Sequence, residues 1–274
     1  MSDAVLSWWR RHRRDLPWRR TRDPWAVLVS ELMLQQTQVP RVLPRYEAFM
    51  VRFPTPAACA AAPVGEVVRA WAGLGYNRRA VNLHRTATAL VEVHNGVLPA
   101  DLDDLVALPG IGPYTARAVL AFAFEADVGV LDVNAIRVLA RAWGRRTQHE
   151  ADALVPPGEG WSWNQAILDL GATVCTKRAP RCERCPILYE CQWHRSGRGE
   201  PDPAGPGSRQ STFAGSDRQG RGRLVDALRT GPVQTADLPA VMGWPDDPSR
   251  AGTVAATLVA DGLVSADGGE YRLP

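Results

Sequence analysis

Residues 175–191 read CTKRAPRCERCPILYEC and contain four cysteines in the spacing C-x6-C-x2-C-x5-C. Four thiolates this close in sequence can enclose one metal centre, and a [4Fe–4S] cluster takes four cysteine ligands. Common four-cysteine zinc modules use two separate C-x-x-C pairs, whereas only Cys182 and Cys185 form such a pair here. The spacing of Cys175, Cys182, Cys185 and Cys191 therefore favours an iron–sulfur cluster over structural zinc, with disulfides the least favoured.

The bulk composition is that of a globular protein without a membrane span. The chain has 274 residues, of which 45% are hydrophobic and 22% charged, enough for one large or two modest domains. It has no apolar run of 18 residues, and its arginine-rich N-terminus lacks the apolar segment of a signal peptide. Grouped cysteines without an export signal predict a cytoplasmic protein. The fifth cysteine, Cys59, lies in an alanine-rich stretch and is expected to be a packed thiol.

Basic residues are grouped rather than numerous, since the net charge is only +3. Arginines cluster at 10–22, at 78–79 and at 137–146, and Lys177 is the only lysine of the chain. A single cluster is most simply a solvated helix face. Several clusters in one chain indicate a surface that binds phosphates.

Helical patterns extend from residue 24 to about 175. Pro24 suits the first turn of a helix, and the residues after it place apolar side chains on one face. Further amphipathic segments are expected near 41–52, 65–72, 78–94, 102–108, 113–124, 134–143 and 162–174. The Gly-, Pro- and Ser-rich residues 196–210 predict a linker. Residues 211–274 predict helices followed by a hairpin around 267–269, a winged-helix-like module that either packs on a partner or contacts DNA.

A turn between two predicted helices has the character of a backbone-binding hairpin. Residues 108–119 read LPGIGPYTARAV. Gly110 and Gly112 allow another chain to approach the turn closely. The first N–H groups of the helix that begins at Pro113 form a ready phosphate site. This arrangement can hold a DNA backbone without reading its sequence, although ordinary helix–helix turns also use Gly-x-Gly.

Two carboxylates in the helical region are candidates for chemistry. Glu31 lies beside the apolar stripe of its helix, where burial raises a carboxyl pKa and suits a general acid. An exposed surface glutamate is the simpler interpretation of Glu31 alone. Asp132 precedes a predicted helix, so an N-capping role for Asp132 or Asn134 is the simplest interpretation there.

Several strings, in order, resemble the adenine DNA glycosylases of the MutY type within the helix-hairpin-helix superfamily. They are LPWR (16–19), SELMLQQTQV (30–39), GLGY (73–76), LPGIGPYTARAV (108–119), LDVNAIRVLAR (131–141) and NQAILDLGATVC (164–175), followed by the four-cysteine loop. The resemblance covers about residues 5 to 195. It implies a mainly α, two-lobed glycosylase fold at 1–195 with a [4Fe–4S] loop at 175–191. The linker at 196–210 and the winged-helix-like α+β module at 211–274 complete the predicted organisation.

The resemblance implies a hydrolase of base excision repair that removes adenine mispaired with 8-oxoguanine or guanine. The adenine is flipped out of double-stranded DNA and its N-glycosidic bond is cut. Glu31 matches the acid that protonates N7 of adenine, and Asp132 matches the carboxylate that stabilises or transiently bonds the sugar. Two carboxyl groups divide these roles in glycoside hydrolysis generally. The resemblance is also to monomeric enzymes that act on the bacterial nucleoid.

The remaining implied site residues follow residue by residue from the matching strings. Tyr114 matches a tyrosine near the sugar, and Asn134 a residue that positions Asp132. Positions that line the adenine pocket match Trp18, Arg19, Leu34 and Gln165. Residues that wedge into the base stack or touch the opposite base match Gln36, Thr37 and Tyr76. The DNA backbone is expected to meet Gly110, Gly112, Lys177, Arg178 and Arg181.

The position of the lysine excludes one related activity. Glycosylases that also cleave the strand carry a Schiff-base lysine in the helix after the hairpin. The matching position here is Tyr114, and Lys177 lies between two cysteines of the loop. The sequence therefore predicts a monofunctional glycosylase without strong lyase activity.

The chain departs from typical members of the family at its C-terminus, where residues 211–274 are too short for the usual Nudix-like domain. This departure leaves the preference for 8-oxoguanine over guanine open. Two other readings also stay open. One is a glycosylase for thymine or uracil opposite guanine, and the other is a non-catalytic iron–sulfur protein that binds DNA.

Overall fold

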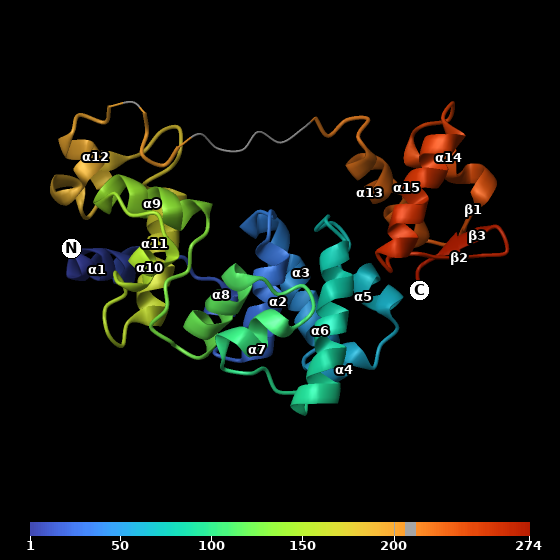
Figure 1. Ribbon diagram of the computed structural model, residues 1–274, viewed down its shortest axis with the longest axis horizontal. Coiled ribbons are helices and arrows are strands. Elements are labelled where there is room, and N and C mark those ends of the chain that lie inside the picture. The colour runs from blue at the N-terminus through green and yellow to red at the C-terminus, as the bar shows by residue number, and fades with distance from the viewer. Residues whose placement is uncertain (200, 206–211) are drawn as a thin grey trace. The chain divides into compact units, whose positions relative to one another are not determined.

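The computed structural model describes residues 1–199, 201–205 and 212–274, and its internal contacts divide the chain into two units (Figure 1). The first unit comprises Met1–Leu28, Ala100–Val106 and Ile111–Ser208. The second comprises Val29–Pro99, Ala107–Gly110 and Arg209–Pro274. Residues 200 and 206–210 of the predicted linker, and residue 211 of the predicted accessory domain, lie outside the described residues. These units differ from the domains expected from the sequence, whose boundaries stay a prediction.

The described residues are mainly helical. The first unit contains α1 (Ser2–His12), η1 (Pro17–Arg19), α8 (Pro113–Ala123), α9 (Val133–Trp143), α10 (Gln148–Asp152), α11 (Gly160–Thr173), η2 (Cys182–Arg184), η3 (Leu188–Glu190) and α12 (Gln192–Arg195). The second contains α3 (Val39–Arg52), α4 (Pro56–Ala60), α5 (Val64–Ala70), α6 (Arg78–His94), α13 (Asp217–Leu228), η4 (Thr235–Asp237), α14 (Leu238–Met242) and α15 (Pro248–Ala260). Two helices, α2 (Pro24–Leu34) and α7 (Leu102–Ala107), include residues of both units. Among the described residues, no helix is long and apolar enough to cross a membrane.

The predicted helices are present, with ends displaced by one or two residues. The sequence reading missed α1, which begins far ahead of the first expected helix. Its residues Val5, Leu6, Trp8 and Trp9 are buried in the core of the first unit. That core is built largely from α1, α9 and α11, which lie side by side in Figure 1. Burial of the apolar face of α1 in this core, rather than intrinsic helix propensity, accounts for a helix in so arginine-rich a segment.

The C-terminal part of the second unit has the helix order and the hairpin that the sequence predicted. Its sheet has the order β1-β3-β2, with β1 (Val233–Gln234), β2 (Ser265–Asp267) and β3 (Glu270–Arg272) all paired antiparallel. The two-residue strand β1 was not expected, because so short a segment carries no alternating pattern. We call residues 212–274 the C-terminal module. It has an apolar core of its own, drawn from α13, α14, α15 and the strands.

Three arginines that the sequence reading assigned to basic surface clusters are buried, so that interpretation is wrong for them. Arg79, Arg137 and Arg141 are no more than 8% exposed. Their guanidinium groups donate to backbone carbonyls and to side chains of neighbouring segments. These arginines act as internal cross-links and are not available to phosphates. Sequence composition could not reveal this, because a buried arginine and a solvated one look alike until the packing is known.

A buried carboxylate joins the N-terminal segment to α11. Asp169, on α11, accepts hydrogen bonds from Arg19 Nη2 at 2.9 Å and Nη1 at 2.7 Å, from Arg14 Nε at 2.6 Å and from Trp9 Nε1 at 3.1 Å. Burial alone would raise the pKa of Asp169, but the hydrogen bonds and charges of Arg19 and Arg14 outweigh burial and lower that pKa below its ordinary value of 3.8. The carboxylate thus fixes residues 9–19 against the core.

Replacing Asp169 with asparagine should lower the free energy of unfolding by about 3 kcal/mol at neutral pH, since two arginines lose their charged partner. The depressed pKa means that this stabilisation is complete above about pH 4 and is lost as the pH falls through the folded-state value. Urea denaturation from pH 7 downward should therefore show the two proteins converging in acid. Asp15→Asn, which removes an exposed partner of Arg20, is the matched control and should not shift the midpoint. A gap between wild type and Asp169→Asn that is unchanged in acid would contradict the assignment.

Candidate functional site

Asp132 caps α9, and its carboxylate is held by three N–H donors. Oδ1 accepts from the backbone N–H of Asn134 at 2.8 Å and of Ala135 at 2.6 Å. Oδ2 accepts from Asn134 Nδ2 at 2.9 Å. The N-cap expected from the sequence is confirmed. The side chain is half-buried rather than enclosed, so the carboxylate is fixed in place while part of it remains accessible.

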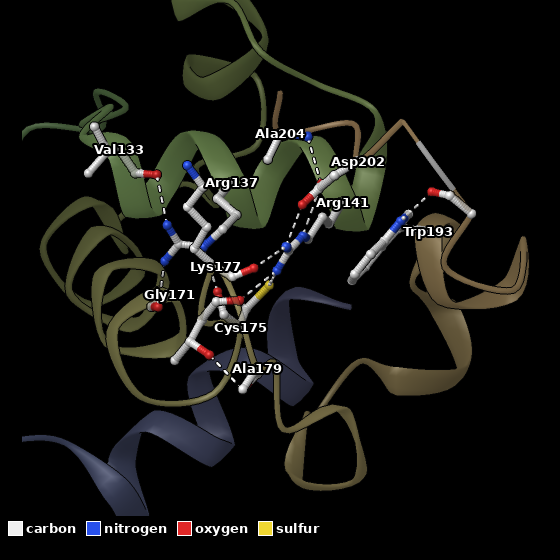
Figure 2. Close-up of polar contacts among 12 residues, drawn as sticks. Val133, Arg137, Arg141, Gly171, Cys175, Lys177, Ala179, Trp193, Asp202 and Ala204 are labelled. Carbon is white, nitrogen blue, oxygen red and sulfur yellow. Dashed lines mark hydrogen bonds and ion pairs between the residues drawn. The ribbon is translucent and has the colours of Figure 1, made fainter. Parts of the chain in front are cut away.

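Asn134 is held in turn by Arg137, one turn further along α9. Arg137 donates from Nη2 to Asn134 Oδ1 and to the carbonyl of Gly171, both at 2.7 Å, and from Nε to the carbonyl of Cys175 at 2.6 Å. Figure 2 shows the bond to Gly171. Burial lowers the pKa of Arg137. A continuous path of hydrogen bonds therefore runs from Asp132 through Asn134 and Arg137 to the first cysteine of the loop. The orientation of the carboxylate depends on the placement of that loop.

A second arginine on α9 anchors the start of the cysteine loop. Arg141 donates to the carbonyls of Thr176 at 2.8 Å and Lys177 at 3.1 Å, and lies 3.6 Å from Cys175 Sγ. Its other donors form an ion pair with Asp202 at 2.5 and 3.1 Å (Figure 2). Its guanidinium also stacks 4.2 Å from the ring of Trp193. Residues on both sides of the loop thus converge on one buried cation.

The four cysteines line one pocket, together with apolar residues that include Val174, Leu188 and Trp193. Cys175, Cys185 and Cys191 pack against the core of the first unit. Burial raises the pKa of the Cys185 thiol to about 12, and the neighbouring cysteines add to this. Among the described residues, no three His, Cys, Asp or Glu side chains converge as ligands of a single ion. The donor set of four sulfurs around an apolar pocket fits a [4Fe–4S] cluster, whose ligands are thiolates.

The three cations of the same loop that the sequence predicted to bind phosphates are solvent-exposed. They are Lys177, Arg178 and Arg181. The backbone N–H of Arg181 donates to the carbonyl of Val174 at 2.9 Å, which fixes the return of the loop against the end of α11. The sequence had predicted backbone-binding cations here, and these side chains remain available for phosphates, unlike the buried arginines of α9.

The predicted hairpin turn lies between α7 and α8. Gly110 has a φ of +76°, and a Cβ there would lie 2.5 Å from Asn82 Nδ2, so only glycine fits. Gly112 caps α8 with extended backbone and has no atom near its missing Cβ, which leaves its surface open. Tyr114, in the first turn of α8, is half-buried. The turn therefore has the open backbone that phosphate binding requires, and its contact with DNA stays a prediction.

Three predicted pocket residues belong to the first unit. Trp18 is 7% exposed and Gln165, on α11, is 4% exposed. Arg19 is engaged by Asp169, as described above. Leu34, the fourth predicted pocket residue, is half-buried at the end of α2 in the second unit. Their roles as a pocket lining stay predictions.

Glu31 lies on α2 in the second unit and is 7% exposed. The simpler interpretation from the sequence, an exposed surface glutamate, is therefore wrong, and the expected burial is confirmed. Burial of this carboxyl shields it from solvent, as a proton donor to an enclosed base requires.

Arg79 organises the segments around Glu31. Its Nη1 donates to the carbonyls of Leu32 at 2.6 Å and Gln35 at 2.6 Å, and its Nη2 donates to Gly75 at 2.9 Å and Leu74 at 3.2 Å. The guanidinium also lies 5.5 Å from the ring centre of Trp71 and 5.6 Å from that of Tyr76. Burial lowers the pKa of Arg79 to about 10. The charge caps the end of α2, where carbonyls lack helical partners.

The predicted wedge residues belong to the two turns that Arg79 joins. Gln36 and Tyr76 have left-handed backbones, with φ values of +54° and +46°. Both side chains are exposed. Thr37 is buried, and its hydroxyl accepts from Arg79 Nη2 at 3.1 Å. A left-handed backbone at a non-glycine residue costs free energy and persists only where its surroundings hold it. Through its bond with Arg79, Thr37 helps to hold the two turns in place. Contact of Gln36 and Tyr76 with DNA stays a prediction.

Sequence reasoning missed the residues that support the candidate site. They are Arg79, Arg137, Arg141, Asp169 and Asp202. The GLGY string and Asn134 lie close in sequence to two of these residues, Arg79 and Arg137, but the hydrogen-bond partners of the set lie as many as 160 positions apart along the chain. No local spacing signals such a pairing.

Comparison with known proteins places these features in one family. A model described as "HhH-GPD superfamily base excision DNA repair protein" matches residues 29–155. An adenine DNA glycosylase of Mycolicibacterium smegmatis is 46% identical, over 96% of this chain and 93% of that protein. One of Mycobacterium tuberculosis is 44% identical, over 98% and 92%. The solved structure of a thermostable thymine-DNA glycosylase is similar with a TM-score of 0.67 at 30% identity, over 71% of this chain and 95% of its own.

Replacing Arg79 with lysine should destabilise the protein by about 3 kcal/mol, because an ammonium cannot satisfy the same carbonyls and leaves some of them buried without donors. Chemical denaturation of wild type and variant measures this difference. Arg69→Lys, at an exposed ion pair with Glu66, is the matched control and should behave as wild type. An Arg79→Lys protein as stable as wild type would show that the carbonyls do not depend on the guanidinium.

Proposed function

The chain belongs to the adenine DNA glycosylase family of the HhH-GPD superfamily of base excision DNA repair proteins, and on this premise we propose that it removes adenine mispaired with 8-oxoguanine or guanine. The reaction is hydrolysis of the N-glycosidic bond in double-stranded DNA. The observation that carries the proposal is the identity with adenine DNA glycosylases over nearly the whole of both chains. The capped Asp132 and the buried Glu31 support it at the matching positions.

Glu31 is the proposed general acid. A purine leaves more readily when N7 carries a proton, because the electron pair of the breaking bond between C1′ and N9 then moves into a neutral base. The carboxyl group of Glu31 donates that proton to the extruded adenine. Its burial keeps water away from the donor and strengthens its interaction with the base.

Asp132 is the proposed partner of the sugar. As the glycosidic bond breaks, C1′ and the ring oxygen take on positive charge, and the carboxylate stabilises this charge or bonds to C1′ transiently. Water then adds to C1′ and leaves an abasic site. The three N–H donors to Asp132 fix the carboxylate before substrate arrives, so little reorganisation is needed during the reaction. Asn134 is the residue that positions it, and Tyr114 is the proposed neighbour of the sugar.

Recognition is assigned to the remaining predicted residues. We propose that the adenine pocket is lined by Trp18, Arg19, Leu34 and Gln165. The wedge and the contacts to the opposite base fall to Gln36, Thr37 and Tyr76. Phosphates are bound by the hairpin glycines Gly110 and Gly112, and by Lys177, Arg178 and Arg181. The exposure of the three cations supports their part of this assignment.

The enzyme is proposed to lack strong lyase activity. Strand cleavage by this superfamily requires a lysine amine at the sugar, and Tyr114 occupies the matching position. The sole lysine, Lys177, is an exposed residue of the cysteine loop in the first unit. The product of the reaction is therefore an intact strand that carries an abasic site.

The cofactor is proposed to be a [4Fe–4S] cluster held by Cys175, Cys182, Cys185 and Cys191. When bound, the cluster gives a loop with little apolar surface of its own a rigid centre. Arg141 then holds the backbone of the loop through its carbonyls, and Arg137 links the loop to Asn134. We also propose that the chain acts as a monomer, in the bacterial cytoplasm at the nucleoid, because its substrate is chromosomal DNA.

A thymine or uracil glycosylase opposite guanine is the second candidate, since a thymine-DNA glycosylase structure is 30% identical to this chain. A pyrimidine has no N7 to protonate, so a buried Glu31 is better matched to adenine. A duplex panel separates the two activities.

The Asp132→Asn variant should lose at least about 100-fold in single-turnover excision while its affinity for duplex DNA stays near that of wild type. Excision is measured on A:8-oxoG, A:G, T:G and U:G duplexes, with alkali to reveal abasic sites. Wild type should act on the first two duplexes and leave strands uncut without alkali. Asp152→Asn, in α10, is a matched first-unit control that should retain activity. Full activity of Asp132→Asn, or excision confined to T:G and U:G, would refute the assignment.

Replacing Cys185 with alanine should lower cluster content and DNA affinity before it alters the bond-breaking rate of the protein that still binds. Iron and zinc analysis and visible absorption report the cofactor, and binding to an uncleavable duplex reports affinity. Cys59→Ala, at a buried thiol that is not part of the loop, should keep full iron content. Zinc in place of iron in the wild type would overturn the cluster, and unchanged binding of an iron-free variant would overturn its structural role.

A further inference from the structure

The C-terminal module has direct contacts with α5 and α6 inside the second unit. The backbone N–H of Gly65 donates to the carbonyl of Pro274 at 2.7 Å. A Cβ at Gly65 would lie 2.3 Å from that oxygen, so α5 accepts the end of the chain only with glycine there. Arg85 donates to the carbonyl of Asp261 at 3.5 Å, and the Asp261 carboxylate pairs with Arg78 at 3.4 Å. The module is therefore seated on these helices by several separate contacts.

Arg229, at the end of α13, makes the most buried of these contacts. Its side chain is 11% exposed. It donates to the carbonyl of Val68 at 3.2 and 3.3 Å, near the end of α5, and from Nη2 to Asn77 Oδ1 at 2.9 Å. Asp226, on the same helix, pairs with Nη1. The guanidinium thus links the module to two points of the helical lobe at once.

Asn77, which Arg229 holds, lies next to a strained turn. Asn77 is the N-cap residue of α6, but its side chain makes no capping hydrogen bond and instead accepts from Arg229. It directly follows the turn Gly73–Tyr76, in which Gly73, Gly75 and Tyr76 all have left-handed backbones. Such a turn is strained at Tyr76 and must be held from outside. Arg79 holds its carbonyls from one side, and Arg229 holds the residue that follows it.

The charges of the module indicate a supporting role rather than a DNA-reading one. Residues 212–274 contain six arginines, eight carboxylates and no lysine. Arginines 221, 229, 250 and 272 are paired with carboxylates of the module itself. A module with more carboxylates than arginines, and with four of its six arginines in ion pairs, is poorly matched to a phosphate backbone.

We propose that the C-terminal module braces the Gly73–Asn77 segment, and that Arg229 is the positioning residue through which it sets the discrimination between 8-oxoguanine and guanine by Tyr76. The proposal rests on the proposed function, in which Tyr76 touches the base opposite adenine. Arg229 does not touch DNA in this scheme. It fixes Asn77, and Asn77 limits the positions that the strained Tyr76 backbone can take. Loss of the link should therefore weaken discrimination while leaving the bond-breaking groups intact.

The test compares single-turnover excision from A:8-oxoG and A:G duplexes by the full-length protein and four variants. Arg229→Ala and Asn77→Ala should each lower the ratio of the two rates about tenfold, since small displacements of a contact group cost rate strongly. The double variant should match either single one, because both remove the same link. Arg272→Ala, at a half-exposed arginine of the hairpin, is the matched control and should keep the wild-type ratio. Amide hydrogen exchange at residues 74–77 should be faster in Arg229→Ala.

The outcomes separate the brace from the activity. An unchanged rate ratio in Asn77→Ala, or additive losses in the double variant, would overturn the role of Arg229. A merely structural role would lower both rates together and leave their ratio unchanged, which also overturns it. A wild type that excises adenine from neither duplex would instead overturn the proposed function. If Arg229→Ala does not fold, Asn77→Ala decides alone, because it leaves the contacts of Arg229 with Val68 and Asp226 in place.

Discussion

The hydrogen bonds of Arg137 are the constraint on which the candidate chemistry depends. One planar guanidinium reaches Asn134 on α9, the carbonyl of Gly171 on α11 and the carbonyl of Cys175 in the cysteine loop. Arginine suits this task because its donors diverge in a fixed plane and its charge persists when buried. Asn134 then presents its amide to Asp132, so the carboxylate is oriented by the packing of three segments. Backbone carbonyls thus fix Arg137, Arg137 fixes Asn134, and Asn134 limits the movement of the proposed catalytic carboxylate.

Arg79 solves a similar problem in the second unit. The end of α2 and the Gly73–Tyr76 turn both present carbonyls that no regular structure satisfies, and one buried charge serves both. In each case the cation is solvated by the protein rather than by a carboxylate, so its desolvation cost is offset by several charge-assisted hydrogen bonds. Asp169 is the converse case, in which one buried anion gathers two arginines and a tryptophan. Buried polar groups, each with its partners, fix the segments that carry the candidate site.

The sequence revealed the residues proposed to act on substrate better than the residues that hold them. The four cysteines form a compact string whose spacing has chemical meaning, and Glu31 and Asp132 lie in strings that resemble the adenine DNA glycosylases. The helices after residue 24 were also predicted correctly, because their apolar periodicity is a local feature of the sequence. Arg79 and Arg137 were misread as surface charge, since burial is decided by segments distant in sequence. The helix α1 was missed for the same reason, as its tryptophans only acquire partners when α9 and α11 are in place.

Strain at the proposed wedge is a consequence of what a wedge must do. To enter a base stack, Gln36 and Tyr76 must displace neighbours whose stacking is worth a few kcal/mol. Insertion by a flexible side chain on a relaxed loop would be unfavourable, because ordering the loop adds an entropic cost at the moment of binding. Left-handed backbones at both residues are already fixed in the free protein, by Arg79 between the turns and by Arg229 beyond Asn77. The cost of order is therefore met during folding, and contact with DNA does not have to supply it.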